Sequence, residues 1–167
     1  MILVFKMYKF TRKQFFKSTS FLFLYLGFMP ATLAAFTALN ELSFGTVAVL
    51  NNGTESEITI NVDNQYNVTN HLRVLTPGQR GEYVLSAYPP FTQLFISANV
   101  TLTETSSAVG SSEQFTLTSL TTAPSVTTDA AGTATIFVGG TLRTSGDGSG
   151  QYFDTDYSVK FDISINY

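Results

Sequence analysis

The sequence predicts an all-β protein built as an antiparallel sandwich of about eight strands. Apolar and polar residues alternate over most of the chain after residue 40, and no stretch has convincing helical periodicity. Alternation of this kind places apolar side chains on one face of a half-buried strand. Thr, Val, Ile, Phe and Tyr dominate these stretches and suit a pleated surface. Turn-forming residues separate them at the spacing typical of sandwiches.

The strands can be followed in order along the chain. Alternation is clearest in four segments, which are residues 57–62, 93–103, 115–118 and 157–167. Asn, Gly and Pro clusters mark the chain reversals, because these residues favour or tolerate the backbone angles of turns. The clusters are residues 51–53, 77–81, 89–90 and 146–150. Residues 105–112 and 121–128 are expected to form longer loops. The apolar positions of three segments are predicted to be buried: Ile96, Ala98, Val100, Ile136, Val138, Phe161, Ile163 and Ile165.

The last segment is predicted to be one unbroken strand of eleven residues. Its apolar face consists of Tyr157, Val159, Phe161, Ile163, Ile165 and Tyr167. A sandwich leaves sheet edges that must be covered or used, and a long terminal strand can pair with a partner. We therefore treat this face, with Leu42 and Phe44 of the expected first strand over residues 42–50, as candidate interaction residues.

The first 35 residues have the organisation of a signal peptide. Lys6, Lys9, Arg12, Lys13 and Lys17 make the start basic, and an uncharged apolar run follows over residues 21–29. Small residues then offer a cleavage site after Ala34 or Ala35. The run is shorter than the ~20 residues of a membrane-spanning helix, so cleavage is favoured over a retained anchor. The expected mature chain is a single domain over residues 36–167, exported to the periplasm, the cell surface or the medium.

Charge and cysteine content exclude several classes of function. The expected mature domain keeps all twelve acidic residues but only four cationic ones, Arg73, Arg80, Arg143 and Lys160, for a net charge of −8. Phosphate backbones would repel so acidic a domain, so nucleic acid is not an expected partner. The chain has no cysteine, which excludes thiol catalysis and thiolate metal sites.

No catalytic or cofactor site is expected. His71 is the only histidine, and no serine has the surroundings of a catalytic triad. Glu55 with Glu57, and Asp154 with Asp156, are carboxylate pairs on single segments, which do not form a cleft by themselves. Asp147, Asp154 and Asp156 are weak metal candidates, because their spacing lacks the calcium-loop pattern. We expect a non-enzymatic protein with no metal.

Three segments of the chain form a distinctive set, which are Leu42-Ser43-Phe44-Gly45-Thr46, the run from Gly132 to Leu142 with its Val138-Gly139-Gly140, and the closing Ile163-Ser164-Ile165-Asn166-Tyr167. Together they resemble domain-of-unknown-function family 4402, secreted bacterial domains related to pilin-like subunits. The similarity extends over residues 42–167. It implies an immunoglobulin-like sandwich with a surface or fimbrial role and no catalytic residue. Val159 stands where the family usually has a glycine, which predicts a straighter final strand.

These observations favour an exported cell-surface structural or adhesive protein. The leading hypothesis is a fimbrial or pilin-like subunit that assembles with itself or other surface subunits through sheet edges, with a periplasmic chaperone as a further candidate partner. Two alternatives stay open. A small outer-membrane β-barrel would also end on an alternating strand with a final aromatic residue. A secreted carbohydrate-binding module would need exposed aromatics, for which the candidates are Tyr88, Phe91, Tyr152 and Phe153.

Overall fold

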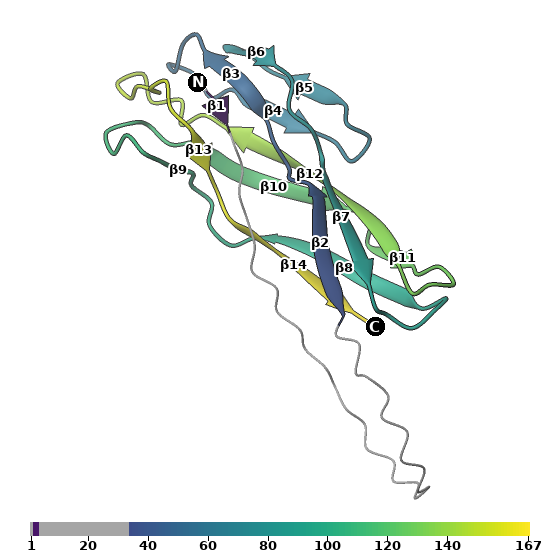
Figure 1. Ribbon diagram of the computed structural model, residues 1–167. Coiled ribbons are helices and arrows are strands. Elements are labelled where there is room, and N and C mark those ends of the chain that lie inside the picture. Colours follow the sequence, from purple (N-terminus) through teal and green to yellow (C-terminus); the bar gives the residue numbers. More distant parts are fainter. Residues whose placement is uncertain (1, 4–33) are drawn as a thin grey trace, which may run out of the picture.

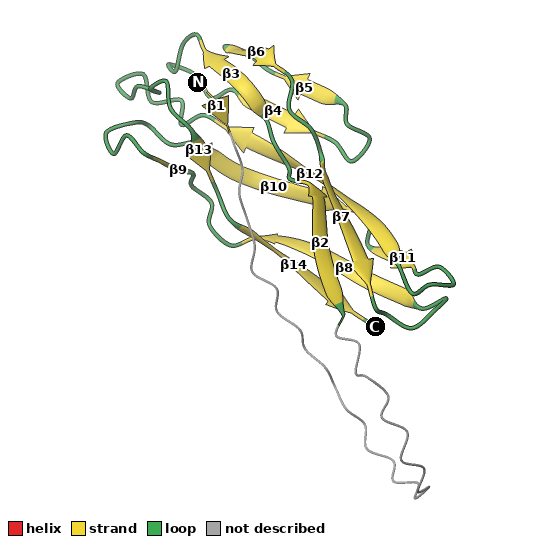
Figure 2. Cartoon of the chain, viewed as in Figure 1, coloured by secondary structure: helices red, strands yellow, loops and turns green. Residues whose placement is uncertain are grey.

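A computed structural model describes residues 2–3 and 34–167 of the chain. The basic residues and the apolar run of the expected signal peptide lie outside the described residues. Of the expected signal peptide, Ile2, Leu3, Ala34 and Ala35 fall inside them. In the described part all secondary structure is β-strand (Figure 2). The sequence prediction of an all-β fold is therefore confirmed.

The larger sheet is organised around its longest strand, β12. Strand β7 pairs with the first half of β12, β4 pairs with the second half on the same side, and β10 pairs along the opposite side. Strands β2 and β5 extend the sheet beyond β7 and β4 (Figure 1). The six strands are β2 (Ala35–Asn40), β4 (Glu57–Ile60), β5 (Tyr66–Val68), β7 (Gly81–Ser86), β10 (Thr116–Thr122) and β12 (Ala134–Arg143).

A second sheet has the order β11-β8-β14, and two smaller sheets complete the fold. In the second sheet β8 (Gln93–Val100) lies between β11 (Ser125–Thr127) and β14 (Phe161–Asn166). A three-stranded sheet has the order β1-β3-β6, and β9 pairs with β13. The bounds of these strands are β1 (Ile2–Leu3), β3 (Gly45–Val49), β6 (Leu72–Thr76), β9 (Ser106–Ser107) and β13 (Tyr157–Ser158).

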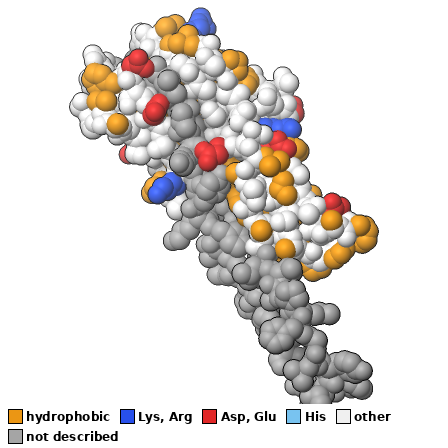
Figure 3. All heavy atoms as spheres, in the orientation of Figure 1, with side chains coloured by type: hydrophobic (Ala, Val, Ile, Leu, Met, Phe, Trp, Pro, Cys, Tyr) orange, Lys and Arg blue, Asp and Glu red, His pale blue; other side chains and the backbone are white. Residues whose placement is uncertain are grey.

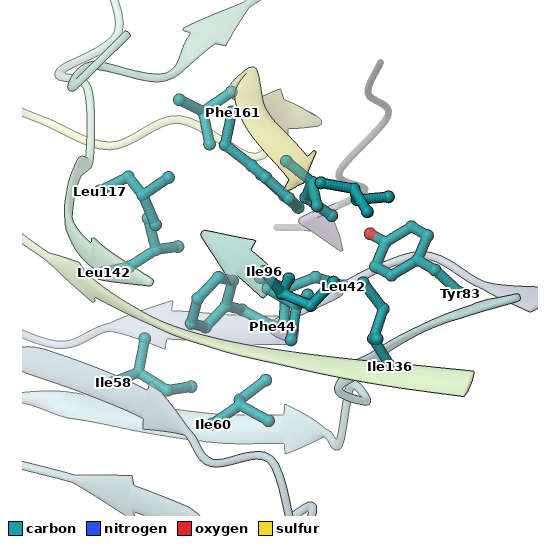
Figure 4. Close-up of a cluster of buried hydrophobic side chains, with 14 of the residues drawn as sticks. Leu42, Phe44, Ile58, Ile60, Tyr83, Ile96, Leu117, Ile136, Leu142 and Phe161 are labelled. Atoms are coloured by element: carbon teal, nitrogen blue, oxygen red, sulfur yellow. The ribbon is translucent and has the colours of Figure 1, made fainter. Parts of the chain in front are cut away.

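The hydrophobic core lies between the sheets and makes the fold a sandwich. Side chains of the larger sheet, such as Ile58 and Ile136, point toward Ile96 and Phe161 of the second sheet (Figure 4). Every strand pairing among the described residues is antiparallel. Burial of one such side chain stabilises a protein by about 1.5–3 kcal/mol. The largest fully buried side chains are Tyr83, Tyr157, Phe44, Phe115, Leu42, Ile58, Ile60, Leu72, Leu85 and Leu94.

The described chain contains fourteen short strands, more than the eight expected. The difference comes from segments of only two or three residues, which are β1, β5, β9, β11 and β13. Segments of two or three paired residues, such as β9, are too short to show as alternation in the sequence. The prediction of the sandwich is confirmed, and the strand count is corrected.

Most of the residues predicted to be buried are buried. Ile96, Ile136, Val138, Phe161, Ile163 and Ile165 are all at most 7% exposed. Ala98 and Val100 are only half-buried. These two lie in the last part of β8, beyond which the chain enters an exposed stretch over residues 101–104. The alternation predicted for β8 is therefore present, but the side chains in the last part of this strand are less deeply buried.

The C-terminal strand is divided in two, where the sequence predicted one. Tyr157 and Ser158 pair with β9, and Phe161 begins the pairing with β8, while Val159 and Lys160 lie outside both strands. The partner strands explain the break, because β8 ends at Val100 and β9 begins at Ser106. Burial still alternates across the break, since Val159 is 3% exposed and Lys160 is exposed. The side chains therefore alternate between buried and exposed as predicted, although the segment pairs with two different strands and is not one continuous strand.

Candidate interaction surfaces

Strand β14 lies at one end of the order β11-β8-β14, which makes it an edge strand among the described strands. Its inner face packs into the core through Phe161, Ile163 and Ile165, and its outer face carries Asp162 and Ser164. The Asp162 carboxylate accepts a hydrogen bond of 2.8 Å from the Thr101 hydroxyl. A strand added beside β14 would therefore be recognised through backbone groups and polar side chains, because the apolar side chains are already packed inside.

The two ends of the predicted C-terminal face have different surroundings. Tyr157 is fully buried at one end, and its hydroxyl hydrogen-bonds Ser112 and both backbone groups of Phe153. Tyr167 is 53% exposed at the other end and contacts Tyr88 edge to face, with ring centroids 5.1 Å apart. Tyr157 therefore anchors a loop, whereas Tyr167 presents an aromatic ring at the surface.

Leu42 and Phe44 are core residues. Their side chains are 2% and 0% exposed, and they flank Ser43, whose backbone exchanges hydrogen bonds of 2.9 and 2.8 Å with Gln79. The strand that follows, β3, has β1 on one side and β6 on the other. Both side chains face the core, and both edges of β3 are paired. The side chains of this segment are therefore unavailable to a partner, whereas cleavage after Ala34 or Ala35 would remove β1 and leave one edge of β3 unpaired.

Strand β2 is an edge that the sequence did not reveal. It pairs with β7 at the end of the larger sheet, and none of its side chains is fully buried. Phe36 stacks on Tyr83 with centroids 5.0 Å apart, and Asn40 donates a side-chain hydrogen bond of 3.1 Å to Glu82. The only signal in the sequence was a short alternation of larger and smaller residues, too brief to be recognised as a strand.

The weak metal candidates have structural roles or lie apart. The Asp147 carboxylate accepts hydrogen bonds from the backbone and hydroxyl of Ser149, and these bonds hold its pKa below the usual value. Asp154 and Asp156 are exposed in the loop before β13. Among residues 2–3 and 34–167, no three His, Cys, Asp or Glu side chains are grouped closely enough to hold a metal ion.

The other charged candidates are also dispersed. Glu55 forms an exposed ion pair with Arg143 at 3.3 Å, and Glu57 is half-buried on β4. His71 is half-buried before β6, and its backbone N–H donates a hydrogen bond of 3.2 Å to the Ser56 hydroxyl. In the described part of the chain these groups do not form a common cluster.

The candidate aromatics of a carbohydrate site do not form one platform. Tyr88 is 6% exposed and Tyr152 is half-buried, with its pKa raised by burial. The Tyr152 hydroxyl accepts a hydrogen bond from the Ser145 backbone and donates one to Gln114 O. Phe91 and Phe153 are exposed, but one lies in the β7–β8 loop and the other in the β12–β13 loop, at opposite ends of the molecule (Figure 1).

Comparison with known families gives one match. Residues 35–167 match the model of the domain of unknown function DUF4402. The chain belongs to this family. The match begins at the first residue of β2, so this edge strand is part of the DUF4402 domain. The resemblance found in the sequence began only at residue 42. No curated protein and no solved structure matches the chain. No helix in the described residues is long and apolar enough to cross a membrane.

The glycine motif of the resemblance has a structural explanation. Gly139 and Gly140 lie in the middle of β12, where three strands meet it. A Cβ atom on Gly139 would lie 2.3 Å from the backbone oxygen of Ile60. Glycine at this position therefore allows the close approach of β4 and β12. The motif supports the sheet and contributes no reactive group.

Proposed function

We propose that this DUF4402 protein is an exported cell-surface structural or adhesive subunit that assembles through a sheet edge. The observation that carries the proposal is the position of β14, an edge strand whose backbone can pair with a partner strand while its apolar face stays packed in the core. Strand addition gives affinity through main-chain hydrogen bonds. The partners that fit are other copies or other surface subunits, with a periplasmic chaperone as a transient partner.

The polar face of β14 supports selective pairing. Exposed Lys160 precedes the strand, and Asp162 and Ser164 lie on its outer face. Charged residues on an edge strand oppose indiscriminate pairing. A partner strand that provides an opposite charge beside Asp162 would be favoured over a random apolar strand. The charged residues near this edge thus favour partner strands of complementary charge over others.

The order of the N-terminal segments supports export. Cleavage after Ala34 would leave the whole of β2 in the mature domain, and cleavage after Ala35 would remove a single residue of it. Processing at either position therefore keeps the larger sheet and removes only β1, the two-residue strand that pairs with β3. The basic start and the apolar run before this point support transport across a membrane.

Substitution of Ser164 by proline tests assembly through β14. Proline removes the Ser164 N–H, which faces Ser97 of β8 because the neighbouring Ile96 N–H is directed to the other side of β8, toward Pro124. The substitution therefore loosens β14 from its place at the sheet edge, so we expect fewer or shorter assemblies in surface material examined by electron microscopy and size analysis. Ser164→Ala is the matched control and keeps the backbone donor. A thermal unfolding curve of each variant separates loss of pairing from loss of the fold. A wild type that is strictly monomeric and captures no partner on cross-linking would contradict the proposal.

A further inference from the structure

The second sheet presents one surface that points away from the core. Inner residues of its three strands, such as Ile96, Val126 and Ile163, pack in or against the core, so the alternate residues are directed outward. Residues directly opposite each other on neighbouring strands share a face. The register therefore assigns nine side chains to one surface, which we call the β8 face: Gln93, Phe95, Ser97, Asn99, Ser125, Thr127, Asp162, Ser164 and Asn166.

The β8 face combines one aromatic ring with small polar side chains. Phe95 is 55% exposed on the central strand, between Ser125 of β11 and Asn166 of β14. The other side chains are hydroxyls and amides, apart from the carboxylate of Asp162. Charged residues usually make up about a quarter to a third of a protein surface. A nearly uncharged polar surface with an exposed ring at its centre is therefore unusual.

Most polar groups of the β8 face are available to a ligand. Within the part of the chain that the structure describes, the side chains of Ser97, Asn99 and Asn166 form no hydrogen bond with another residue. The Thr101 hydroxyl donates a bond of 2.8 Å to the Asp162 carboxylate and orients it. Side-chain amides and hydroxyls both donate and accept hydrogen bonds. The face therefore offers donors and acceptors at fixed positions on a sheet.

These groups form a row along β8. Residues on one face of a strand follow each other at about 7 Å, so the row from Phe95 through Ser97 to Asn99 extends over about 14 Å. Ser164 lies opposite Ser97, and Asp162 lies opposite Asn99. Three strands make the face about 10 Å wide. It is therefore long enough for a chain of several small rings and not only for one.

The distribution of charge does not favour an anionic ligand. Lys and Arg side chains lie apart from one another in the view of Figure 3. Arg143 is paired with Glu55, and Arg80 lies over the ring of Phe137 at 3.6 Å. Lys160 is the only Lys or Arg within or directly beside β8, β11 and β14 in the sequence. One cation on a domain with an expected net charge of −8 would not hold a polyanion.

The β8 face also lacks the centre of a protein interface. Such a centre is rich in apolar side chains that exclude water together. Phe95 is the only apolar side chain of this face, and the hydroxyls and amides around it would lose their water in a protein contact. A ligand that carries its own hydroxyl groups would replace this water with hydrogen bonds. The polar surroundings of the ring thus favour a hydroxyl-rich ligand.

We infer that the β8 face is a binding site for a neutral, extended oligosaccharide. The C–H groups on one side of a sugar ring pack well on the negative face of an aromatic ring, which places one sugar over Phe95. The following sugars lie over Ser97 and Asn99, where their hydroxyls exchange hydrogen bonds with the side chains. Strand faces of other β-folds bind oligosaccharides in this way.

This binding site is separate from the edge proposed for assembly. A partner strand would pair with the backbone of β14 at its free edge, whereas the sugar would contact side chains that stand above the sheet. The two contacts therefore do not compete. A subunit that assembles through β14 would repeat the β8 face along the assembly, which raises the strength of attachment to a repetitive glycan.

An NMR titration of the ¹⁵N-labelled protein, purified as the producing cells process it, tests the inference. The probes are laminarihexaose and mannohexaose, which are neutral, with the anionic hexagalacturonate for comparison. We expect a neutral probe to shift the amide signals of Phe95, Ser97 and Asn99, and the side-chain NH2 signals of Asn99 and Asn166. Hexagalacturonate should bind more weakly than the neutral probe, because the domain is acidic.

Phe95→Thr should weaken binding about tenfold or more, since an aromatic ring at the centre of a contact is a common hot spot. Its melting temperature should change little, because Thr suits a strand and the ring is not part of the core. Phe153→Thr makes the same exchange at an exposed phenylalanine in the β12–β13 loop, and this matched control should bind as the wild type does. Asn99→Thr should weaken binding about twofold to tenfold through loss of amide hydrogen bonds.

Three results would overturn the inference. They are the absence of shifts with both neutral probes up to about 10 mM, shifts confined to residues outside the β8 face, and a Phe95→Thr variant that binds as tightly as the wild type. Phe95→Thr should still form assemblies of wild-type length. Loss of sugar binding can therefore be told apart from loss of assembly, and sugar binding by a strictly monomeric wild type would support the β8 face while counting against assembly through β14.

Discussion

Gly132 shows how a single residue connects two turns of the sandwich. It has a φ of +71°, and a Cβ atom there would lie 2.0 Å from the backbone oxygen of Tyr88. Its N–H donates to the oxygen of Asp129, and its own oxygen accepts the N–H of Tyr88. The β11–β12 turn and the β7–β8 loop thus pack against each other at Gly132, where the Cβ atom of any other residue would clash with the backbone of Tyr88. This residue opens the Gly132–Leu142 stretch of the family resemblance.

Gly132→Ala is expected to destabilise the protein by about 1–3 kcal/mol, the usual cost of a strained backbone position, with the steric clash added. Gly110→Ala is the matched control, because nothing lies within 4 Å of the added methyl group and the φ of Gly110 is not positive. Urea unfolding of both variants measures the difference in the free energy of unfolding. Equal stability of the two variants would show that the turn can rearrange around a side chain.

At the scale of the element, β14 depends on its inner face. Ile163 is 7% exposed, belongs to the core and pairs with Ala98 of β8. Replacement by alanine is expected to cost about 2–5 kcal/mol, because it removes buried methyl groups and leaves a cavity. Ser164→Ala, one residue along on the outer face, should change the free energy of unfolding by less than ~0.5 kcal/mol. A loss of less than ~0.5 kcal/mol for Ile163→Ala in denaturant unfolding would mean that the strand has been assigned the wrong register.

The elements show which features the sequence could predict. Alternation identified the inner faces of β8 and β14, because burial on one face leaves a period of two in the residues. It did not reveal the break at Val159 and Lys160, because the break is set by the partner strands and not by the residues themselves. Strand β2 was missed since its side chains are only half-buried or exposed. A strand that is held mainly by its backbone leaves little trace in composition.

The candidate surface was predictable to a similar extent. The alternation correctly placed Phe161, Ile163 and Ile165 on one face, but only the strand order shows that β14 is an edge. Leu42 and Phe44 were grouped with them, although both are buried core residues.

At the scale of the whole molecule, the N-terminal boundary of the domain decides which strands the mature protein contains. The DUF4402 match and β2 both begin at Ala35. Ala35 pairs with Ser86, at the end of β7 that leads into the β7–β8 loop. A cleavage site a few residues further along would remove β2 and leave β7 as the sheet edge. Processing near Ala34 or Ala35 instead keeps the larger sheet whole.

We therefore expect N-terminal sequencing of the exported protein to give a chain that starts at Ala35 or Phe36. The reason is the order of basic, apolar and small residues before this point, with small side chains at Thr32 and Ala34. Thr32→Arg should block cleavage, because a bulky charged side chain does not suit the small-residue site. The precursor would then accumulate with the membrane fraction, while an unaltered wild type serves as the control. An intact Met1 in the exported wild-type protein would contradict cleavage, and a start beyond Asn40 would contradict the role of β2 in the mature sheet.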